Sequence, residues 1–426
     1  MAFMGPIKSF HWQFAGQVCR LPAMATQQSD IQPNTTPGEI HLFRFLAVTT
    51  LGKWLINTGK RIFYPFAPAM ARGMGVDVSA ITSLIALNQT TALLAPFVMS
   101  LADTKGFKPV ALLAMLVTLI AFLAMGFFPV YGVVLVGIFL IGMTKSVIDP
   151  TFQAMVGEHV APRHRGRAVG IMEISWAAST LISIPVCGFI ISRYHWQTPF
   201  LVLAVLTLIC LGILYKVLPE NRAKQAETSR VRVKEWLILF KNPRIAALLI
   251  YSFCVCMAND NFFVTYGFWL EDTYALSLTS IGLGTILIGG AEILGELLMA
   301  FLSDRLGIVR TLRWSTLFSA LSFLALLFLD GELGRALGGL FLIFFTFEFS
   351  YVTSMALTTE LSTTNRGTLL SLFFAVRGLG RVVGALSGGI CWSFSGITGV
   401  CAVSGLVTLV AFLVLIPGLR QAPAHA

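Results

Sequence analysis

The stretches MSLADTKGFKPV (residues 99–110) and FLSDRLGIVR (residues 301–310) contain the same short charged turn, and each follows a long apolar run. Their aspartates, Asp103 and Asp304, lie 201 residues apart. The same offset relates further pairs in the two halves of the chain, namely Gly106 and Gly307, Arg165 and Arg366, Gly166 and Gly367, and Gly188 and Gly389. This repetition indicates that the chain contains two copies of one structural unit.

The composition indicates that most of the surface faces something other than water. Of the 426 residues, 56% are hydrophobic and 12% are charged, whereas soluble globular proteins carry about 25% charged residues. Residues 110–130, 200–215 and 397–419 contain no charge, and runs of roughly 20 apolar residues match the hydrocarbon thickness of a bilayer. Backbone groups in lipid must form their hydrogen bonds within the segment, so we expect helices that span a membrane.

Twelve candidate spans follow a mixed segment of 40 residues that has no sustained periodicity and no signal-peptide pattern. They cover residues 42–69, 79–101, 109–128, 131–157, 167–191, 196–217, 244–270, 280–302, 311–329, 335–358, 368–391 and 395–417. We therefore predict an all-α integral membrane protein of twelve transmembrane helices in two pseudo-symmetric six-helix bundles. The predicted parts are a flexible cytoplasmic tail (1–40), an N-terminal bundle (41–217), a cytoplasmic linker (218–243), a C-terminal bundle (244–417) and a cytoplasmic tail (418–426).

The distribution of lysine and arginine predicts the orientation of the chain. With the N-terminus in the cytoplasm, 21 of the 30 basic residues lie in the tails, the cytoplasmic loops or the adjoining span ends, and only three lie outside. Basic residues near the ends of spans accumulate on the cytoplasmic side. This bias predicts cytoplasmic N- and C-termini, and it explains the net charge of +10 without a nucleic-acid partner.

The repeated turns resemble a motif of the major facilitator superfamily, whose loop between the second and third spans reads approximately G-x-x-x-D-R-x-G-R-R. The residues that match it are Asp304, Arg305, Gly307 and the nearby Arg310 in the second copy, and Asp103, Gly106, Lys108 and the displaced Lys105 in the first. The leading glycine is replaced by Met99 and Ala300. The stretch GEHVAPRHRGRAVG (residues 157–170) also resembles the family's loop after the fourth span, so the resemblance covers residues 42–417.

The resemblance implies a transporter in which these turns act as a cytoplasmic latch. An aspartate at a helix end can bind nearby arginines and the N-terminus of a neighbouring helix. The alternative is that the charges of the turns only set the topology. Two family patterns are degraded: Ile138 stands where the fourth span usually carries arginine, and Ile184 and Cys187 replace glycines of the antiporter motif in the fifth span.

Ionisable residues within spans are costly in lipid, so each is a candidate functional residue. Six bases and six acids fall within the predicted spans. A buried carboxylate without full compensation by cations can bind and release a proton near neutral pH. The predicted proton-coupling residues are Asp260, Glu292, Glu348, Glu296 and Asp149, with Asp260 ranked first because it has no basic partner on its own helix.

The candidate solute-binding residues are the bases and amides within spans. Lys53, Asn57 and Lys60 share one helical face, and the bases suit a solute with a negative group. The full set is Lys53, Asn57, Lys60, Arg61, Lys145, Asn259, Asn261, Arg377 and Arg381. Simple ion pairing is the structural alternative, in particular Lys145 with Asp149 and the acids of the eighth span, Glu292 and Glu296, with the arginines of the eleventh.

These observations predict a secondary active transporter that exports a small organic solute in exchange for protons. We expect it in the plasma (inner) membrane, as a monomer, with a small-molecule substrate, protons and lipid as its partners and without a cofactor. Proton-coupled uptake of a metabolite, which could be anionic, is the alternative within this class. A membrane enzyme is disfavoured because the chain has no HExxH or GxSxG motif, and its seven cysteines lack metal-site spacing. A transport-inactive receptor is the remaining alternative.

Overall fold

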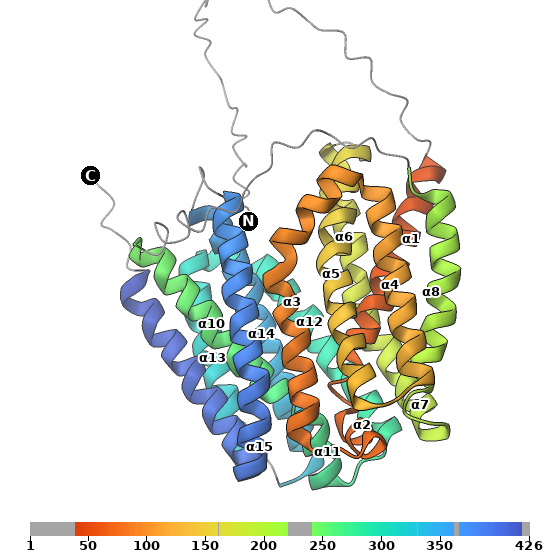
Figure 1. Cartoon of the computed structure of the whole chain (residues 1–426). Helices are drawn as coiled ribbons and strands as arrows, with labels where there is room; N and C mark the ends of the chain where they lie inside the picture. The colour runs from red at the N-terminus through yellow and green to blue at the C-terminus, as the bar shows by residue number, and fades with distance from the viewer. Residues whose placement is uncertain (1–38, 161, 220–240, 330, 362–365, 420–426) are drawn as a thin grey trace, which may run out of the picture. The chain divides into compact units, whose positions relative to one another are not determined.

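The computed structural model describes residues 39–160, 162–219, 241–329, 331–361 and 366–419, and most of these residues are helical (Figure 1). The first half contains α1 (Glu39–Arg61), α2 (Ala67–Met74), α3 (Val78–Lys105), α4 (Phe107–Phe127), α5 (Tyr131–His159), α6 (Pro162–Ala178), the π-helix η1 (Ser179–Ser183), α7 (Ile184–Arg193) and α8 (Thr198–Val217). The second half contains α10 (Pro243–Phe263), α11 (Tyr266–Tyr274), α12 (Leu278–Leu306), α13 (Ile308–Leu329), α14 (Leu333–Leu361) and α15 (Arg366–Gly418). Residues 1–38, 220–240 and 420–426, which include most of both predicted tails and of the linker, lie outside this description.

The number of spans agrees with the sequence prediction once three further spans are added to the helices that pass a simple length and hydropathy test. These are the bent pair α2 and α3, a second span within α15, and α1. Among the described residues, nine helices are long and apolar enough to cross a membrane, or ten if the bent pair α2 and α3 is one span. One of the nine covers 47 residues and bends at Gly396, where φ is 57°, so it contains two spans. Helix α1 is not among the nine, but its 23 residues are sufficient to cross a membrane. The fold is therefore the predicted one of twelve spans.

The helix boundaries repeat along the chain with the offset found in the sequence. Helix α4 begins at Phe107 and α13 at Ile308, while α8 ends at Val217 and α15 at Gly418. The turns before α4 and α13 also have the same backbone conformation, since φ is 90° at Gly106 and 81° at Gly307. Side chains other than glycine rarely adopt such angles, which explains why the glycine recurs.

Three predicted spans are not continuous helices. The span predicted for residues 42–69 ends its first helix at Arg61, and the span predicted for 244–270 ends its first helix at Phe263. In the first case the turn contains Pro65, which has no amide hydrogen to continue the helical ladder. The span predicted for 167–191 contains the π-helix η1, which ends two residues before Pro185. A wider turn at this point accommodates the hydrogen-bond donor that proline lacks.

Helices α10 and α15 pack with their backbones in direct contact. Three glycines of α15, spaced by one helical turn, face backbone carbonyls of α10: Gly380 faces Phe253, Gly384 faces Met257 and Gly388 faces Asn261. A Cβ atom at any of the three positions would collide with the facing carbonyl oxygen. Small residues allow helices in membranes to approach closely and to gain dispersion contacts. This contact fixes the two helices that carry Asp260 and Arg381.

The turn at Gly307 offers a test of backbone strain alone, because no atom lies within 4 Å of a Cβ built there. We expect Gly307→Ala to destabilise the protein by about 1–2 kcal/mol, since alanine must adopt a positive φ. Gly290→Ala is the matched control: its site is equally open and the backbone is helical, so alanine should be neutral or stabilising. Thermal unfolding in detergent measures both. Equal melting temperatures for the two variants would contradict the strain argument.

Candidate functional site

A network of lysines and acids joins α1, α5 and α6. Lys53, whose side chain is 1% exposed, places Nζ 2.6 Å from Glu173 Oε1 and 3.4 Å from Asp149 Oδ1. Lys145 Nζ lies 2.8 Å from Asp149 Oδ2, one turn along the same helix, which confirms the ion pair expected from the sequence. Because two bases face two acids, the network balances its own charge.

Asn57 and Trp176 extend this network toward Arg61. The Asn57 side chain accepts a hydrogen bond from Lys145 Nζ at 2.7 Å and donates one to Ser175 Oγ at 3.2 Å. The ring of Trp176 lies 4.2 Å from Arg61 Cζ and 5.5 Å from Lys145 Nζ. Cations over the face of an indole ring are stabilised by its quadrupole. Asn57, Lys145 and Arg61 therefore belong to one connected group.

A second group of polar residues connects the two halves of the chain through Gln89 of α3. Lys60 donates to Gln89 Oε1 at 3.0 Å, and Gln89 Nε2 donates to Asp260 Oδ1 at 3.0 Å. The same amide also donates to the Tyr64 hydroxyl at 2.8 Å. Asp260 is 1% exposed and lies in the last turn of α10. Asp260, predicted from the sequence without a basic partner on its own helix, has one on α15: Arg381 Nε lies 3.6 Å from Asp260 Oδ2.

A third contact joins the halves directly. Arg61 Nη2 of α1 lies 2.7 Å from Glu292 Oε1 of α12, and both side chains are buried. The alternative that Glu292 pairs with the arginines of the eleventh span is wrong for this residue, because its partner comes from the other half of the chain. Within the described part of the chain, Arg61 Nη1 and Glu292 Oε2 have no hydrogen-bond partner. The pair is therefore joined by a single buried bond, and each side chain keeps one further polar atom that could form a hydrogen bond.

The remaining candidate acids, Glu296 and Glu348, have no ion pair among the described residues. Glu348 is 8% exposed, and a Cβ built on Gly295 would lie 3.1 Å from Glu348 Cβ, so this acid packs against α12 close to Glu292 and Glu296. Glu296 itself is exposed. Three carboxylates thus gather where α12 meets α14.

The two candidate asparagines of α10 differ in their contacts. The side-chain amide of Asn261 lies 2.7 Å from Ser387 Oγ and 3.2 Å from Ser404 Oγ, so it binds α10 to α15 within the second half. Asn259 is 3% exposed, and its Oδ1 has no partner in the described part of the structure. Asn259 therefore has a free hydrogen-bond acceptor, whereas the side-chain amide of Asn261 is already bound to serines of α15.

The repeated turns are described only in part. Lys108 Nζ lies 5.5 Å from the centre of the Tyr215 ring, and Arg305 and Arg310 are exposed. The side chains of Asp103, Lys105 and Asp304 lie outside the described residues, so the latch stays a prediction.

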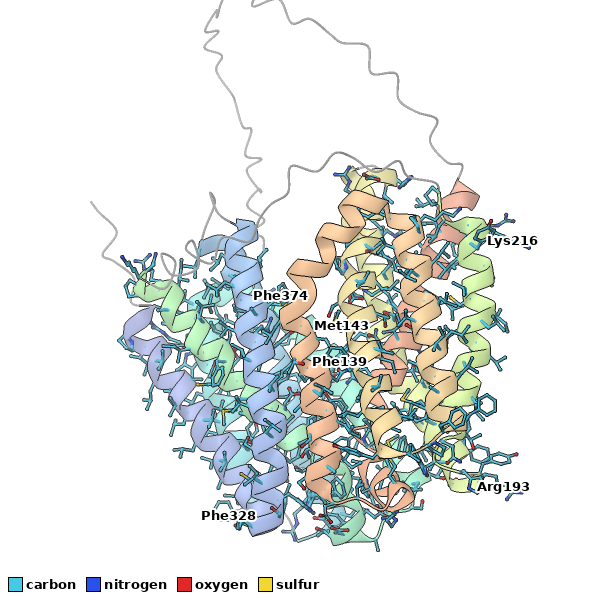
Figure 2. All side chains as sticks on the ribbon, in the orientation of Figure 1. Phe139, Met143, Arg193, Lys216, Phe328 and Phe374 are labelled. Atoms are coloured by element: carbon cyan, nitrogen blue, oxygen red, sulfur yellow. The ribbon has the colours of Figure 1, made fainter. Side chains whose placement is uncertain are left out.

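Further contacts between the halves lie toward the end of the helices where Arg193 lies, opposite the end where Lys216 lies (Figure 2). At this end Arg72 of α2 binds Glu271 of α11 at 2.7 Å, and Thr279 of α12 donates to Ser192 Oγ at 3.0 Å. Further along, Gly188 of α7 approaches α12 so closely that a Cβ there would lie 2.8 Å from Leu278 O. The Glu173 side chain, by contrast, is 50% exposed although its partner Lys53 is buried. The lysine network is thus accessible at one edge.

The Arg61–Glu292 bond can be measured with a double-mutant cycle. Removing one partner leaves a buried charge without compensation, so we expect Arg61→Gln and Glu292→Gln each to destabilise the protein by about 3 kcal/mol. The double variant removes both charges and should be more stable than either single variant. Unfolding in detergent gives the coupling energy. Additive single effects would show that the two side chains do not interact.

No group of three or more His, Cys, Asp or Glu side chains in the described residues could hold a metal ion. Three comparisons with known proteins add independent information. The model of the Major Facilitator Superfamily matches residues 49–264 and 248–425. The chain is 27% identical to the uncharacterized MFS-type transporter YceJ of Bacillus subtilis over 331 residues, which is 76% of this chain and 84% of that protein.

A further relative is the multidrug resistance protein MdtG of Salmonella typhi, which is 27% identical over 234 residues, 52% of this chain and 56% of MdtG. Among solved structures, the D-xylose-proton symporter superposes with a TM-score of 0.73 and 16% identity, covering 88% of this chain and 97% of that one. At this identity the superposition shows a shared fold.

Proposed function

The chain belongs to the Major Facilitator Superfamily, a family of multi-pass secondary transporters, and from this premise we propose that it exports a small organic solute in exchange for protons. Asp260 is the proposed principal proton carrier, with Glu292 and Glu348 as further proton sites. The solute is proposed to bind among the bases and amides that surround these acids.

The observation that carries the proposal is that two buried acids form bonds between the halves of the chain. Asp260 accepts from Gln89 at 3.0 Å, and Glu292 binds Arg61 at 2.7 Å. A proton on Glu292 would remove the charge that holds Arg61, and a proton on Asp260 would weaken the attraction of Arg381. Both changes act on side chains between the halves, so proton binding can favour one arrangement of the halves over the other.

Exchange follows if the solute and the proton favour opposite arrangements. In the proposed cycle the acids take protons from the outer side, the halves reorient, and the protons leave to the cytoplasm. The solute then binds while the acids are ionised and is carried outward as the halves return. The likeness to MdtG, a multidrug resistance protein, supports export of drug-like compounds.

The location and orientation are also proposals. The bias of 21 basic residues on one side against three on the other supports cytoplasmic N- and C-termini in the inner membrane. In this orientation the contacts between the halves near Arg193 lie on the outer side. We also propose a monomer as the working unit.

The experiment is proton flux across liposomes that contain the purified protein. A pH gradient is imposed, a dye inside reports pH, and aromatic cations, neutral compounds and anions are added in turn. We expect proton movement only with a transported compound, in the direction opposite to that compound. Flux in the same direction would replace export with symport, and proton movement that never depends on a solute would reject coupled transport.

A further inference from the structure

Arg377 is a buried cation whose hydrogen-bonding capacity is largely unused. Its side chain lies in α15 and is 4% exposed. Its Nε and Nη1 atoms have no hydrogen-bond partner among the described residues, and no described carboxylate lies within ion-pair distance. Burying an ionised group without a partner is strongly unfavourable. A protein that retains such a group in its interior has a site suited to an anion.

The surroundings of Arg377 hold the guanidinium group in place without occupying its donors. Arg377 Cζ lies 3.3 Å from the centre of the Tyr351 ring and 4.6 Å from that of Phe373. Contact with a ring face stabilises the cation and orients its plane. The N–H groups point outward in that plane, so stacking leaves them available to an acceptor.

Comparison with the neighbouring arginine shows that this arrangement is particular to Arg377. Arg381 lies one turn further along the same helix and faces Asp260 at 3.6 Å. Glu348, the acid nearest to Tyr351 along α14, interacts with Arg377 only beyond ion-pair distance: it forms no ion pair among the described residues and packs against α12. Arg381 thus has a carboxylate within ion-pair distance, whereas the Nε and Nη1 donors of Arg377 are free to bind a ligand.

We propose that Arg377 binds the carboxylate of an anionic solute, so that the transported compounds include aromatic monocarboxylates. The class follows from charge and contacts. Arg377 has no described carboxylate within ion-pair distance, so its free donors suit one carboxylate, whereas a phosphate dianion would bring a further negative charge close to Glu348. The rings of Tyr351 and Phe373 beside the cation favour a flat apolar body over a sugar. This inference rests on the proposed transport function and names its substrate class.

The test is binding to the purified full chain in detergent, without any gradient. The probes are benzoate, 2-naphthoate and indole-3-acetate, and the controls are benzamide and benzylammonium, which have the same ring with neutral and positive groups. We expect at least one carboxylate to raise the unfolding temperature in a saturable manner, and neither control to do so. No response to any carboxylate, or an equal response to benzamide, would overturn the proposal.

Variants of Arg377 localise the binding. We expect Arg377→Met to weaken carboxylate binding at least tenfold, while Arg335→Met, at an exposed arginine near the start of α14, leaves it unchanged. If Arg377→Met fails to fold, Arg377→Lys tests the assignment instead. Lysine keeps the positive charge but lacks the planar, stacked donors of arginine, so we expect it also to weaken carboxylate binding tenfold. Unchanged affinity in a folded variant would overturn the assignment.

The binding experiment and the flux experiment test the Arg377 site and proton coupling separately. Carboxylate binding that depends on Arg377, without solute-dependent proton flux, would keep this site and reject proton coupling. Proton flux driven only by neutral or cationic compounds, without carboxylate binding, would keep coupled transport and reject the site.

Discussion

In Asp260→Asn we expect solute-dependent proton flux in liposomes to fall at least tenfold while the protein remains folded. Asparagine has nearly the same shape and can still accept the hydrogen bond from Gln89, which lies 3.0 Å from Asp260 Oδ1. It carries no charge to hold Arg381 and cannot bind and release a proton. The variant therefore separates the geometry of the site from its proton chemistry.

The control for this variant is Asp272→Asn, which removes an exposed carboxylate at the end of α11. Its flux should equal that of the unmodified protein. If Asp260→Asn transports protons at the same rate as the control, Asp260 has no part in coupling, and Glu292 or Glu348 becomes the principal candidate. Circular dichroism and the unfolding temperature establish that each variant is folded.

The second large effect is expected for Gly384→Val in α15. The Cβ of valine would collide with Met257 O and come within 3.0 Å of the Met257 Cα and carbonyl carbon, which are backbone atoms that cannot rotate away. Helices α10 and α15 must therefore separate. We expect a loss of about 3 kcal/mol or more, with most of the protein lost during expression or purification.

Gly284→Val is the matched control for this substitution. Gly284 lies in α12, and no atom lies within 4 Å of a Cβ built there. The same change of residue in an open helical position should reduce stability only slightly, through the helix propensity of valine. Similar yields and unfolding temperatures for the two variants would show that α10 and α15 tolerate separation. The measurements are size-exclusion profiles and thermal unfolding in detergent.

The twelve spans and their repeat were predictable because both depend on local patterns. Apolar runs set the helices, and a fixed offset relates the turns at Gly106 and Gly307. The pair Lys145 and Asp149 was predictable for the same reason, since residues four apart on a helix are neighbours. The interruption of the first span after Arg61 was missed because the apolar pattern continues across the turn.

The partners of the buried charges could not be predicted, because they depend on which helix faces which. Asp260 meets Arg381 from α15, and Arg61 meets Glu292 from the other half. Gln89 was missed altogether, although the polar run Asn88 to Thr91 within an apolar span was a visible signal. An uncharged amide attracts little attention beside lysines and acids, yet Gln89 is the residue that joins Lys60 to Asp260.

The backbone contact between α10 and α15 determines where a change of charge on Asp260 can have a mechanical effect. Asp260 and Arg381 lie on α10 and α15, whose backbones are in direct contact at three glycines of α15. When the attraction between these two side chains changes, α10 and α15 cannot respond by moving relative to one another. The response must instead reach the boundary with α3, where Gln89 donates to Asp260 and Thr82 packs against Gly389 of α15. The stiffness of one helix pair thus directs the response to a proton toward its neighbour.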